Sequence, residues 1–283
     1  MKKVALYPNP ERDEGFGATL AVAALCRAAG AAVTLPETCA AGLPETPDIT
    51  VCPEPEALRG ADCIIVLGGD GTVLHAAKAA SREDIPILGV NLGRVGFMTE
   101  LEAGELPLLR EVLAGRFSRD RRMMLRVEVR RDGCAAGEAL ALNDAVLTGG
   151  LTGRVIPLEV LSDGQPILSF FGDGVIVATP TGSTAYSMSA GGPIIEPTAD
   201  SLVVTPLCPH ALFAQSIVFS ANRRLTLRPR PGNPAFLTVD GSPLPLRPGD
   251  AVSIDRAPSH TTLIRVKEHS FYERLNRKLQ KPP

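Results

Sequence analysis

A buried strand that runs straight into a glycine-rich turn is the sequence feature that most constrains the fold of this chain. Residues 61–67 are apolar except for Asp62, residues 68–72 read GGDGT, and an amphipathic segment follows from residue 73. A strand buried on both faces, then a tight turn and a helix, is the repeating unit of a parallel sheet covered by helices. We therefore expect an α/β architecture in this part of the chain.

Neighbouring segments show the same alternation of apolar strands, turns and helices. Residues 3–7 and 85–90 are predicted strands, and residues 18–29 are a predicted helix that ends at Gly30. The strand at 85–90 also leads into a glycine-rich turn, at residues 91–96. Ligands in open α/β sheets bind beyond the carboxyl ends of the strands, so both turns are candidate parts of a binding site.

The character of the sequence changes after residue 118. A predicted helix at 104–115 contains Pro107, and from Arg122 onward there are many short runs rich in Val, Ile, Leu and Thr, separated by turn residues. This pattern predicts a mostly antiparallel all-β domain. We expect an α/β domain at residues 1–118, a β-rich domain at 119–268, and a C-terminal helix at 269–281 that packs back on the first domain.

Composition excludes several classes of protein. Of the 283 residues, 45% are hydrophobic and 21% are charged, with a formal charge of -2. The chain therefore has neither the low hydrophobicity of disordered proteins nor the basic excess of nucleic-acid-binding proteins. Pro8 and Pro10 interrupt the apolar N-terminus, and no apolar run approaches the roughly 20 residues that span a bilayer. We expect a cytoplasmic protein that binds neither nucleic acid nor membranes.

The cysteines and histidines do not predict a metal site. The six cysteines include no CxxC pair, and the four histidines have no HxxH or HExxH spacing. We expect reduced, mostly structural cysteines and no dedicated metal centre.

The turn at residues 68–72 has the chemistry of a phosphate-binding loop. Its glycines expose backbone N–H groups at a positive helix end, and Thr72 is able to cap the helix. The spacing matches neither a Walker A loop nor GxGxxG. Asp70 sets the turn apart, because a carboxylate repels phosphate unless it accepts a hydrogen bond from an attacking hydroxyl or contacts a cation. The alternative is an ordinary tight turn in which Asp70 caps the helix.

A second group of polar residues follows the apolar strand at residues 174–178. Residues 179–193 read TPTGSTAYSMSAGGP, which combines small hydroxyl groups with the flat, polar-tipped ring of Tyr186. A nucleoside site needs that combination. The alternative is a capped helix start with Tyr186 in the core. No GxSxG motif is present, which disfavours a serine hydrolase.

Asn143 and Asp144 interrupt an otherwise apolar strand at residues 141–147. Burial of an amide beside a carboxylate is costly unless both groups are satisfied. These residues either line a site or form a β-bulge or strand-end turn.

In their order, these motifs resemble the bacterial NAD kinase family. They are GGDGT at 68–72, NLGRVGF at 91–97, Asn143-Asp144, GDG at 172–174 and TPTGSTAY at 179–186, and the similarity continues to Asp240-Gly241. GGDGT alone is shared with diacylglycerol, sphingosine and phosphofructo-kinases, whereas TPTGSTAYSMSAGGP is far more specific. The resemblance implies an NAD kinase/diacylglycerol kinase-like fold and ATP-dependent phosphorylation of the adenosine 2′-hydroxyl of NAD.

The resemblance also implies roles for individual residues, with Asp70 as the catalytic proton acceptor. The implied NAD-binding residues are Asp70, Gly71, Phe97, Asn143, Asp144, Arg154, Asp173, Thr181, Thr184, Ala185, Tyr186, Ser189 and Cys208. The implied phosphate- or ATP-binding residues are Gly68, Gly69, Gly71, Thr72 and Asp240. Arg154 and Cys208 match family contact positions by approximate spacing only. Two positions depart from the family pattern: Asp144 stands where many relatives have glutamate, and Val95 where they have leucine.

The same resemblance implies ATP as phosphoryl donor, with Mg²⁺ or another divalent cation as its partner, and a homodimer or homotetramer. The alternatives are a lipid kinase that shares the GGDGT turn and a non-catalytic dinucleotide-binding sensor. A lipid kinase predicts a membrane-facing apolar surface, whereas the hydroxyl-rich segment with Tyr186 favours a soluble nucleotide. Intact Asp70 disfavours the sensor.

Overall fold

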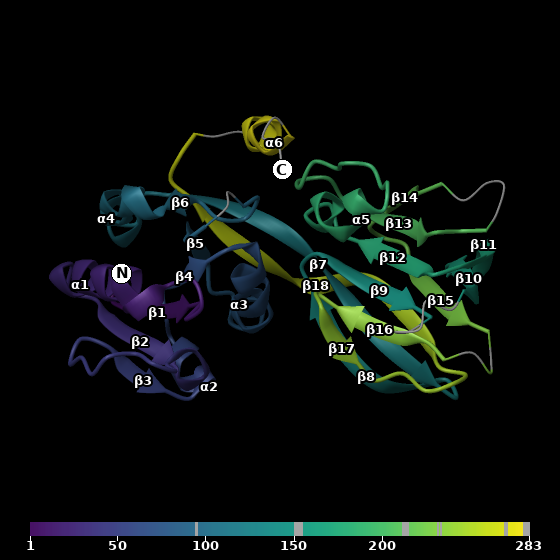
Figure 1. The fold of residues 1–283 in the computed structure, drawn as a ribbon, viewed down its shortest axis with the longest axis horizontal. Coiled ribbons are helices and arrows are strands. Elements are labelled where there is room, and N and C mark those ends of the chain that lie inside the picture. The colour runs from purple at the N-terminus through teal and green to yellow at the C-terminus, as the bar shows by residue number, and fades with distance from the viewer. Residues whose placement is uncertain are drawn as a thin grey trace. The chain divides into compact units, whose positions relative to one another are not determined.

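The computed structural model describes residues 1–93, 96–149, 155–210, 215–230, 232, 234–268 and 271–279. Internal contacts divide the chain into two compact units (Figure 1). Unit 1 comprises Met1–Arg121 and His260–Pro283, and unit 2 comprises Arg122–Ser259. None of the described helices is long and apolar enough to cross a membrane.

Unit 1 is built on a parallel sheet, drawn in purple and blue in Figure 1. Its strands lie in the order β3 (Thr50–Cys52), β2 (Ala32–Pro36), β1 (Lys3–Pro8), β4 (Cys63–Gly68) and β5 (Ile87–Asn91). The short β6 (Leu101–Glu102) and the end of β18 (Ala251–Arg265) also pair with β5 in parallel. The predicted parallel sheet is confirmed.

Helices cover both faces of this sheet. They are α1 (Gly17–Ala28), α2 (Glu54–Leu58), α3 (Asp70–Glu83) and α4 (Leu109–Leu113), with short 3₁₀ turns η1 (Glu14–Phe16), η2 (Glu37–Cys39) and η3 (Ala103–Leu108). The C-terminal helix α6 (Phe271–Leu279) also belongs to unit 1, where it contacts the segment at residues 97–100. The helix predicted at 104–115 is η3 followed by α4. Pro107 lies within η3, and proline has no N–H to donate to a regular helical hydrogen bond.

The core of unit 1 explains why β4 reads as a continuous apolar run. Ile65 and Leu67 pack with Leu6 of β1 against residues of α1 and α4, such as Val22 and Leu109. Alternate strand residues point to the opposite face, where α3 packs against β4 and β5. All six residues of β4 are buried, so the strand is covered on both faces.

Unit 2 contains two antiparallel sheets. The first has the order β14 (Ile217–Ser220), β13 (Ser201–Leu207), β12 (Gly174–Ala178), β9 (Asp144–Thr148), β16 (Phe236–Val239) and β17 (Ser242–Leu244). The second contains β11 (Gln165–Gly172), β10 (Ile156–Ser162), β15 (Leu225–Pro229), the first part of β18, β7 (Ser118–Arg131) and β8 (Cys134–Ala141). The predicted antiparallel β class is confirmed.

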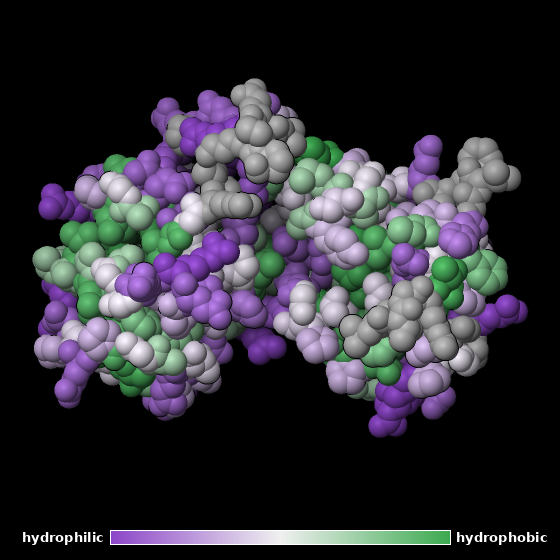
Figure 2. Space-filling view, in the orientation of Figure 1, coloured by the Kyte–Doolittle hydropathy of each residue, from purple (hydrophilic) through white to green (hydrophobic). Residues whose placement is uncertain are grey.

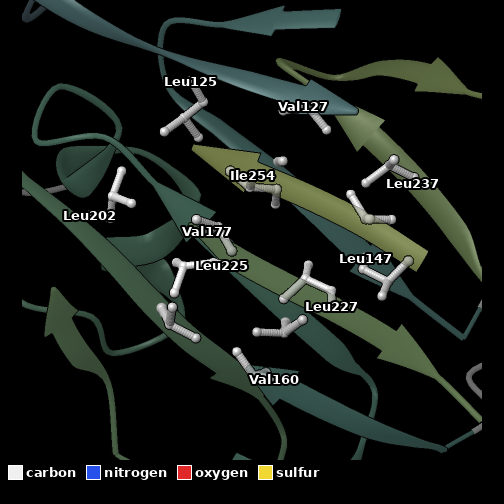
Figure 3. Packing of buried hydrophobic residues seen from close by; sticks show 14 of the residues in the cluster. Leu125, Val127, Leu147, Val160, Val177, Leu202, Leu225, Leu227, Leu237 and Ile254 are labelled. Atoms are coloured by element: carbon white, nitrogen blue, oxygen red, sulfur yellow. The ribbon is translucent and has the colours of Figure 1, made fainter. Parts of the chain in front are cut away.

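Side chains from both sheets of unit 2 form one core (Figure 3). Val127 and Ile254 come from the second sheet, and Leu147, Val177 and Leu237 come from the first. On the other face of the first sheet, a smaller apolar cluster lies near the turn η4 (Gly182–Thr184) and α5 (Tyr186–Ser189), which follow β12. Between these two apolar layers, β9 and β12 are neighbouring strands that pair antiparallel.

Two long strands, β7 and β18, belong partly to each unit. Contacts place residues 260–268 in unit 1, whereas the sequence prediction assigned them to the β-rich domain. The reason is that Leu263 pairs with Ile87 of β5 and Ile264 is buried in the core of unit 1. Alternating apolar residues predict a strand, but they do not reveal which strand is its partner.

Candidate active site

The GGDGT turn joins β4 directly to α3. β4 ends at Gly68 and α3 begins at Asp70, two residues before the Thr72 cap that the sequence predicted. Thr72 is therefore inside the first turn, where its Oγ1 accepts a hydrogen bond from the Gly69 N–H at 3.4 Å. A Cβ at Gly68 would lie 2.3 Å from this Oγ1, so only glycine fits there. The first two N–H groups of α3, those of Asp70 and Gly71, have no acceptor within the helix and are available to an anion, whereas the Thr72 N–H donates to the Gly69 carbonyl at 3.0 Å.

The Asp70 carboxylate is held by a second glycine-rich turn. Its Oδ2 accepts a hydrogen bond from the Phe97 N–H at 2.8 Å, and its Oδ1 accepts one from the Met98 N–H at 3.0 Å. A Cβ at Gly96 would lie 2.1 Å from Oδ1, which explains the glycine at that position. Both oxygens keep lone pairs for a further donor, because an ionised carboxylate has about four acceptor sites. The carboxylate is therefore oriented and still able to accept a hydrogen bond.

A pocket opens where the strand order of unit 1 reverses. From β1 the chain proceeds outward to β2 and β3, then returns to β4 on the other side of β1. Ligands in open α/β sheets bind at such a switch point, beyond the carboxyl ends of the strands. The pocket has a volume of about 620 Å³, and its lining includes Asn9, Arg12, Gly69, Gly71, Thr72 and His75.

Arg12 is the cation of this pocket. Its Nη1 is 2.8 Å from where a Cβ of Gly69 would lie and 3.1 Å from where a Cβ of Gly93 would lie. The guanidinium therefore rests on the backbone of both glycine-rich turns. The planar donor fork of arginine matches phosphate oxygens. Sequence reasoning missed Arg12; the signal was its place just beyond β1, which becomes meaningful only once β1 is known to lie beside β4.

The C-terminal helix α6 brings another cation to Asp70. The Lys278 Nζ lies 4.0 Å from Asp70 Oδ2 and 4.1 Å from the centroid of the Phe97 ring. Phe97 also contacts Phe271 of α6, with 6.4 Å between ring centroids. Sequence reasoning assigned no site residue to this helix, because nothing local links residue 278 to residue 70.

Buried Glu100 ties α6 to the segment that holds Asp70. It accepts hydrogen bonds from Arg265 at 3.1 Å and from Arg274 at 2.6 Å, while Arg274 also donates to the Thr99 carbonyl at 3.2 Å. Burial opposes the charge of Glu100, but the two arginines and the N–H groups of Val266 and Lys267 outweigh it and hold the pKa of this carboxyl below its usual range. The network fixes α6 and the segment after Phe97 in unit 1.

In unit 2, Asn143 and Asp144 are organised by Asp240. The Asp240 carboxylate accepts hydrogen bonds from the N–H groups of Leu142 at 2.7 Å, Asn143 at 2.9 Å and Asp144 at 3.1 Å. These three bonds use much of its acceptor capacity. Asp240 therefore shapes the start of β9, and its predicted contact with phosphate or ATP stays a prediction.

The Asp144 carboxyl is in an unusual environment. Its residue is only 7% exposed, and Asp240 lies close by. Burial, followed by the charge of Asp240, raises the pKa of Asp144 to about 7. The group is thus poised to exchange a proton near neutral pH.

The hydroxyl-rich segment packs against Asn143. Thr179 Oγ1 donates to the Leu142 carbonyl at 2.6 Å, and a Cβ at Gly182 would lie 2.1 Å from the Asn143 carbonyl oxygen. Thr181 is buried, and its hydroxyl accepts a hydrogen bond from Arg122 at 3.2 Å. Tyr186 is 49% exposed, so the alternative that placed it in the core is wrong. The start of the segment is therefore closely packed, whereas the Tyr186 ring is exposed and able to contact a ligand.

Asp173 and Cys208 lie at the other end of β12. Gly174 pairs with Thr148, whereas Ala178 pairs with Asp144 at the opposite end of the strand. At about 3.3 Å per residue, the two ends of this strand are roughly 13 Å apart. A hydrogen bond to the Asp173 carboxylate and its negative charge raise the pKa of the Cys208 thiol. The predicted NAD-binding residues of unit 2 therefore form two groups.

Comparison with known proteins decides the family. Models described as the N-terminal and C-terminal domains of ATP-NAD kinase match residues 17–117 and 142–266. The NAD kinase of Symbiobacterium thermophilum is 44% identical over 283 residues, which cover 99% of this chain and 99% of that protein. The chain belongs to the NAD kinase family.

Further relatives agree. The NAD kinase of Syntrophotalea carbinolica is 47% identical over 77% of this chain and 78% of its own length. Among solved structures, yeast NADH kinase complexed with NADH has a TM-score of 0.89 at 25% identity and covers 99% of this chain and 87% of that chain. An Archaeoglobus fulgidus NAD kinase in complex with ATP shares the fold, with a TM-score of 0.74 at 23% identity over 99% of both chains.

Membership of the NAD kinase family confirms the resemblance seen in the sequence, and the structure shows where the predicted residues lie. Gly68, Gly69, Asp70, Gly71, Thr72 and Phe97 meet in unit 1. One end of β12 in unit 2 carries Asn143, Asp144, Thr181, Thr184, Ala185, Tyr186, Ser189 and Asp240, and the other carries Asp173 and Cys208. Arg154 and the Arg94-Val95 pair lie outside the described residues.

Proposed function

We propose that this chain is an NAD kinase that transfers the γ-phosphoryl group of ATP to the adenosine 2′-hydroxyl of NAD. The products are ADP, NADP and a proton. The observation that carries the proposal is the Asp70 carboxylate, which stands at the N-terminus of α3 and is oriented by two backbone N–H groups. An anion-binding turn with a fixed hydrogen-bond acceptor in its centre suits transfer of phosphate to a hydroxyl.

Asp70 acts as the proton acceptor in this proposal. Phosphoryl transfer passes through a loose transition state, so positioning and charge stabilisation supply most of the catalysis. A carboxylate is a weak base. It accepts a hydrogen bond from the 2′-hydroxyl, holds the oxygen in line with the donor phosphate, and takes the proton as the bond to phosphorus forms.

The switch-point pocket of unit 1 is the proposed place for the donor phosphates. Backbone N–H groups at the start of α3 and the Arg12 guanidinium both point to anion binding there. The divalent cation enters with ATP, since no three His, Cys, Asp or Glu side chains in the described part of the chain gather into a possible metal site. ATP commonly brings Mg²⁺ as its phosphate partner.

Replacement of Arg12 by alanine tests the donor site. We expect the KM for ATP to rise about 10- to 100-fold, because a hydrogen bond to a charged group contributes about 1.5–3 kcal/mol. The KM for NAD should stay within about twofold, and steady-state kinetics with each substrate varied in turn measure both values. Arg27→Ala is the matched control, because Arg27 is an exposed arginine of α1 that pairs with Asp48. A KM for ATP equal to that of the wild type would remove Arg12 from the site.

The proposed NAD-binding residues of unit 2 supply hydroxyl recognition and a stacking surface. Asn143 and Asp144 offer amide and carboxylate groups that pair with ribose hydroxyls. The exposed ring of Tyr186 offers a face for a base. Asp240 is a positioning residue in this proposal, because it holds the backbone that presents Asn143 and Asp144.

We further propose a homodimer or homotetramer in which the two ends of β12 serve different NAD molecules. Their positions at opposite ends of the strand, roughly 13 Å apart, support this division. Light scattering should give two or four times the chain mass of 29.8 kDa. Mixing two weakened variants, Asp144→Ala and Asp173→Ala, should restore activity by forming sites that contain both intact residues. A mixture no more active than its components would contradict the division.

One assay tests the activity itself. The pure protein is incubated with ATP, Mg²⁺ and NAD, and NADP is detected by an NADP-specific dehydrogenase. The same preparation is offered diacylglycerol in place of NAD, with phosphate transfer followed from labelled ATP. Formation of NADP supports the proposal, whereas transfer to the lipid alone, or to neither acceptor, rejects it.

A further inference from the structure

The C-terminal helix places a lysine beside the proposed proton acceptor. Lys278 Nζ lies 4.0 Å from Asp70 Oδ2 and over the face of the Phe97 ring, 4.1 Å from its centroid. The Lys278 side chain remains 35% exposed and the Asp70 side chain 27% exposed. A ligand that approaches from solvent can therefore contact both the Lys278 ammonium group and the Asp70 carboxylate.

Anchoring of α6 does not depend on this lysine. Arg274, whose side chain is only 14% exposed, makes the ion pair with buried Glu100 and donates to backbone carbonyls of the Phe97 segment. Lys278 lies one turn further along α6, on which Glu273, Asn276 and Arg277 are also exposed. In Figure 2, purple hydrophilic atoms lie beside the grey ones at the top of unit 1. Arg274 therefore holds α6 in place, while Lys278 on the same helix stays available to a ligand.

The chemistry at Asp70 calls for a cation. Negative charge spreads over the oxygens of a phosphoryl group in transfer, and phosphate-transferring sites neutralise it with lysine, arginine or metal ions. The GGDGT turn lacks the lysine of a Walker A loop, and Asp70 itself adds a negative charge. Arg12 lies over Gly69 in the donor pocket, so the acceptor side of the turn needs its own positive group.

We propose that Lys278 is a catalytic residue that contacts the phosphoryl group as it passes to the hydroxyl held by Asp70; this rests on the proposed function. An ammonium group has three donors on a flexible four-carbon stem. One donor faces Asp70, and the others reach an oxygen of a phosphoryl group bound next to that carboxylate. No covalent bond to Lys278 forms, and the proton of the hydroxyl goes to Asp70.

The first test replaces Lys278 by alanine in the full-length protein. We expect kcat to fall at least about 100-fold, because loss of one donor to a developing oxyanion typically costs that much. The KM for NAD and the melting temperature should be nearly unchanged, since Arg274 keeps α6 in place. Arg277→Ala is the matched control, because Arg277 is the exposed cationic neighbour on the same helix. Lys278→Arg should recover part of the lost kcat through its charge.

A second measurement is independent of turnover. In equilibrium titrations, Lys278→Ala should weaken binding of NADP about tenfold and leave binding of NAD unchanged, because only NADP carries the 2′-phosphate. If the wild type makes NADP and Lys278→Ala has the same kcat, the inference is wrong and the proposed function stands. A higher kcat would identify an inhibitory contact and also overturn it. If the wild type makes no NADP, the proposed function fails, and an unchanged NADP-to-NAD affinity ratio in Lys278→Ala overturns the lysine contact separately.

Discussion

Replacement of Asp70 by asparagine should lower kcat by about 10²- to 10⁴-fold, the range that a positioned acid–base group contributes, and should leave the affinity for NAD nearly intact. The amide has almost the shape of the carboxylate, so it still orients a hydroxyl, but it takes no proton. Turnover is measured as NADP formed, and affinity is measured by titration with NAD in the absence of ATP. A variant with near-normal turnover would remove Asp70 from its proposed role.

A matched control separates this chemistry from loss of hydrogen bonds. The Asp70 carboxylate accepts two backbone N–H groups, and an amide keeps only one oxygen for them. Asp13, in the same unit, also accepts two backbone N–H groups, those of Ala18 and Thr19, one on each carboxylate oxygen. Asp13→Asn should therefore show a comparable change in melting temperature with unchanged kcat. Equal losses of kcat in both variants would point to folding as the cause.

Asp144→Asn should stabilise the protein relative to the wild type more at pH 8 than at pH 5. The folded protein holds a proton on Asp144 up to about pH 7, whereas the unfolded chain releases it near the ordinary value of 3.8. The wild type therefore loses stability as pH rises from about 4 to 7, and above that range the loss is complete. Because a tenfold change in proton affinity is about 1.4 kcal/mol, the whole loss is at most about 4 kcal/mol, of which about 3 kcal/mol falls between pH 5 and pH 8. Urea unfolding at both pH values measures it.

Asp255, whose contribution to stability changes with pH in the opposite direction, provides the control for Asp144. Burial disfavours the charge of Asp255, but hydrogen bonds and charges from Arg126 and Arg224 prevail and lower the pKa of this carboxyl. Its contribution to stability is present at neutral pH and is lost as pH falls through its folded-state pKa. Asp255→Asn should therefore destabilise the protein at pH 8 more than at pH 5. An Asp144→Asn variant with equal stability effects at both pH values would show that Asp144 has no raised pKa.

Local patterns in the sequence were sufficient to predict the class of each part of the fold and the GGDGT turn. The apolar run of β4 and the glycines after it identify a buried strand followed by a helix, because those properties belong to adjacent residues. Arg12 and Lys278 could not be found in this way. Arg12 reaches the turn because β1 lies beside β4, and Lys278 reaches Asp70 because Glu100 binds α6. Both depend on contacts between distant parts of the chain.

The resemblance to the family also gave an incomplete account of the predicted NAD-binding residues. It grouped Asp173 with Asn143 and Asp144, whereas β12 separates Asp173 from them by its full length. Its assignment of Asp240 to phosphate or ATP stays a prediction, and it did not reveal that this carboxylate accepts three backbone N–H groups. A motif records which residues occur together, but it does not record the direction in which each side chain points.

The division of unit 1 between the two ends of the chain has a consequence for its biosynthesis. A ribosome that adds about 5–20 residues per second needs on the order of ten seconds to make unit 2 after residue 121. During that interval β5 has no β18 beside it, and the core lacks Ile264. Arg265 and Arg274, the partners of Glu100, are also made after unit 2, so the segment that holds Asp70 is secured only then. A truncated product therefore has an incomplete first unit, with a free strand edge that chaperones and proteases recognise.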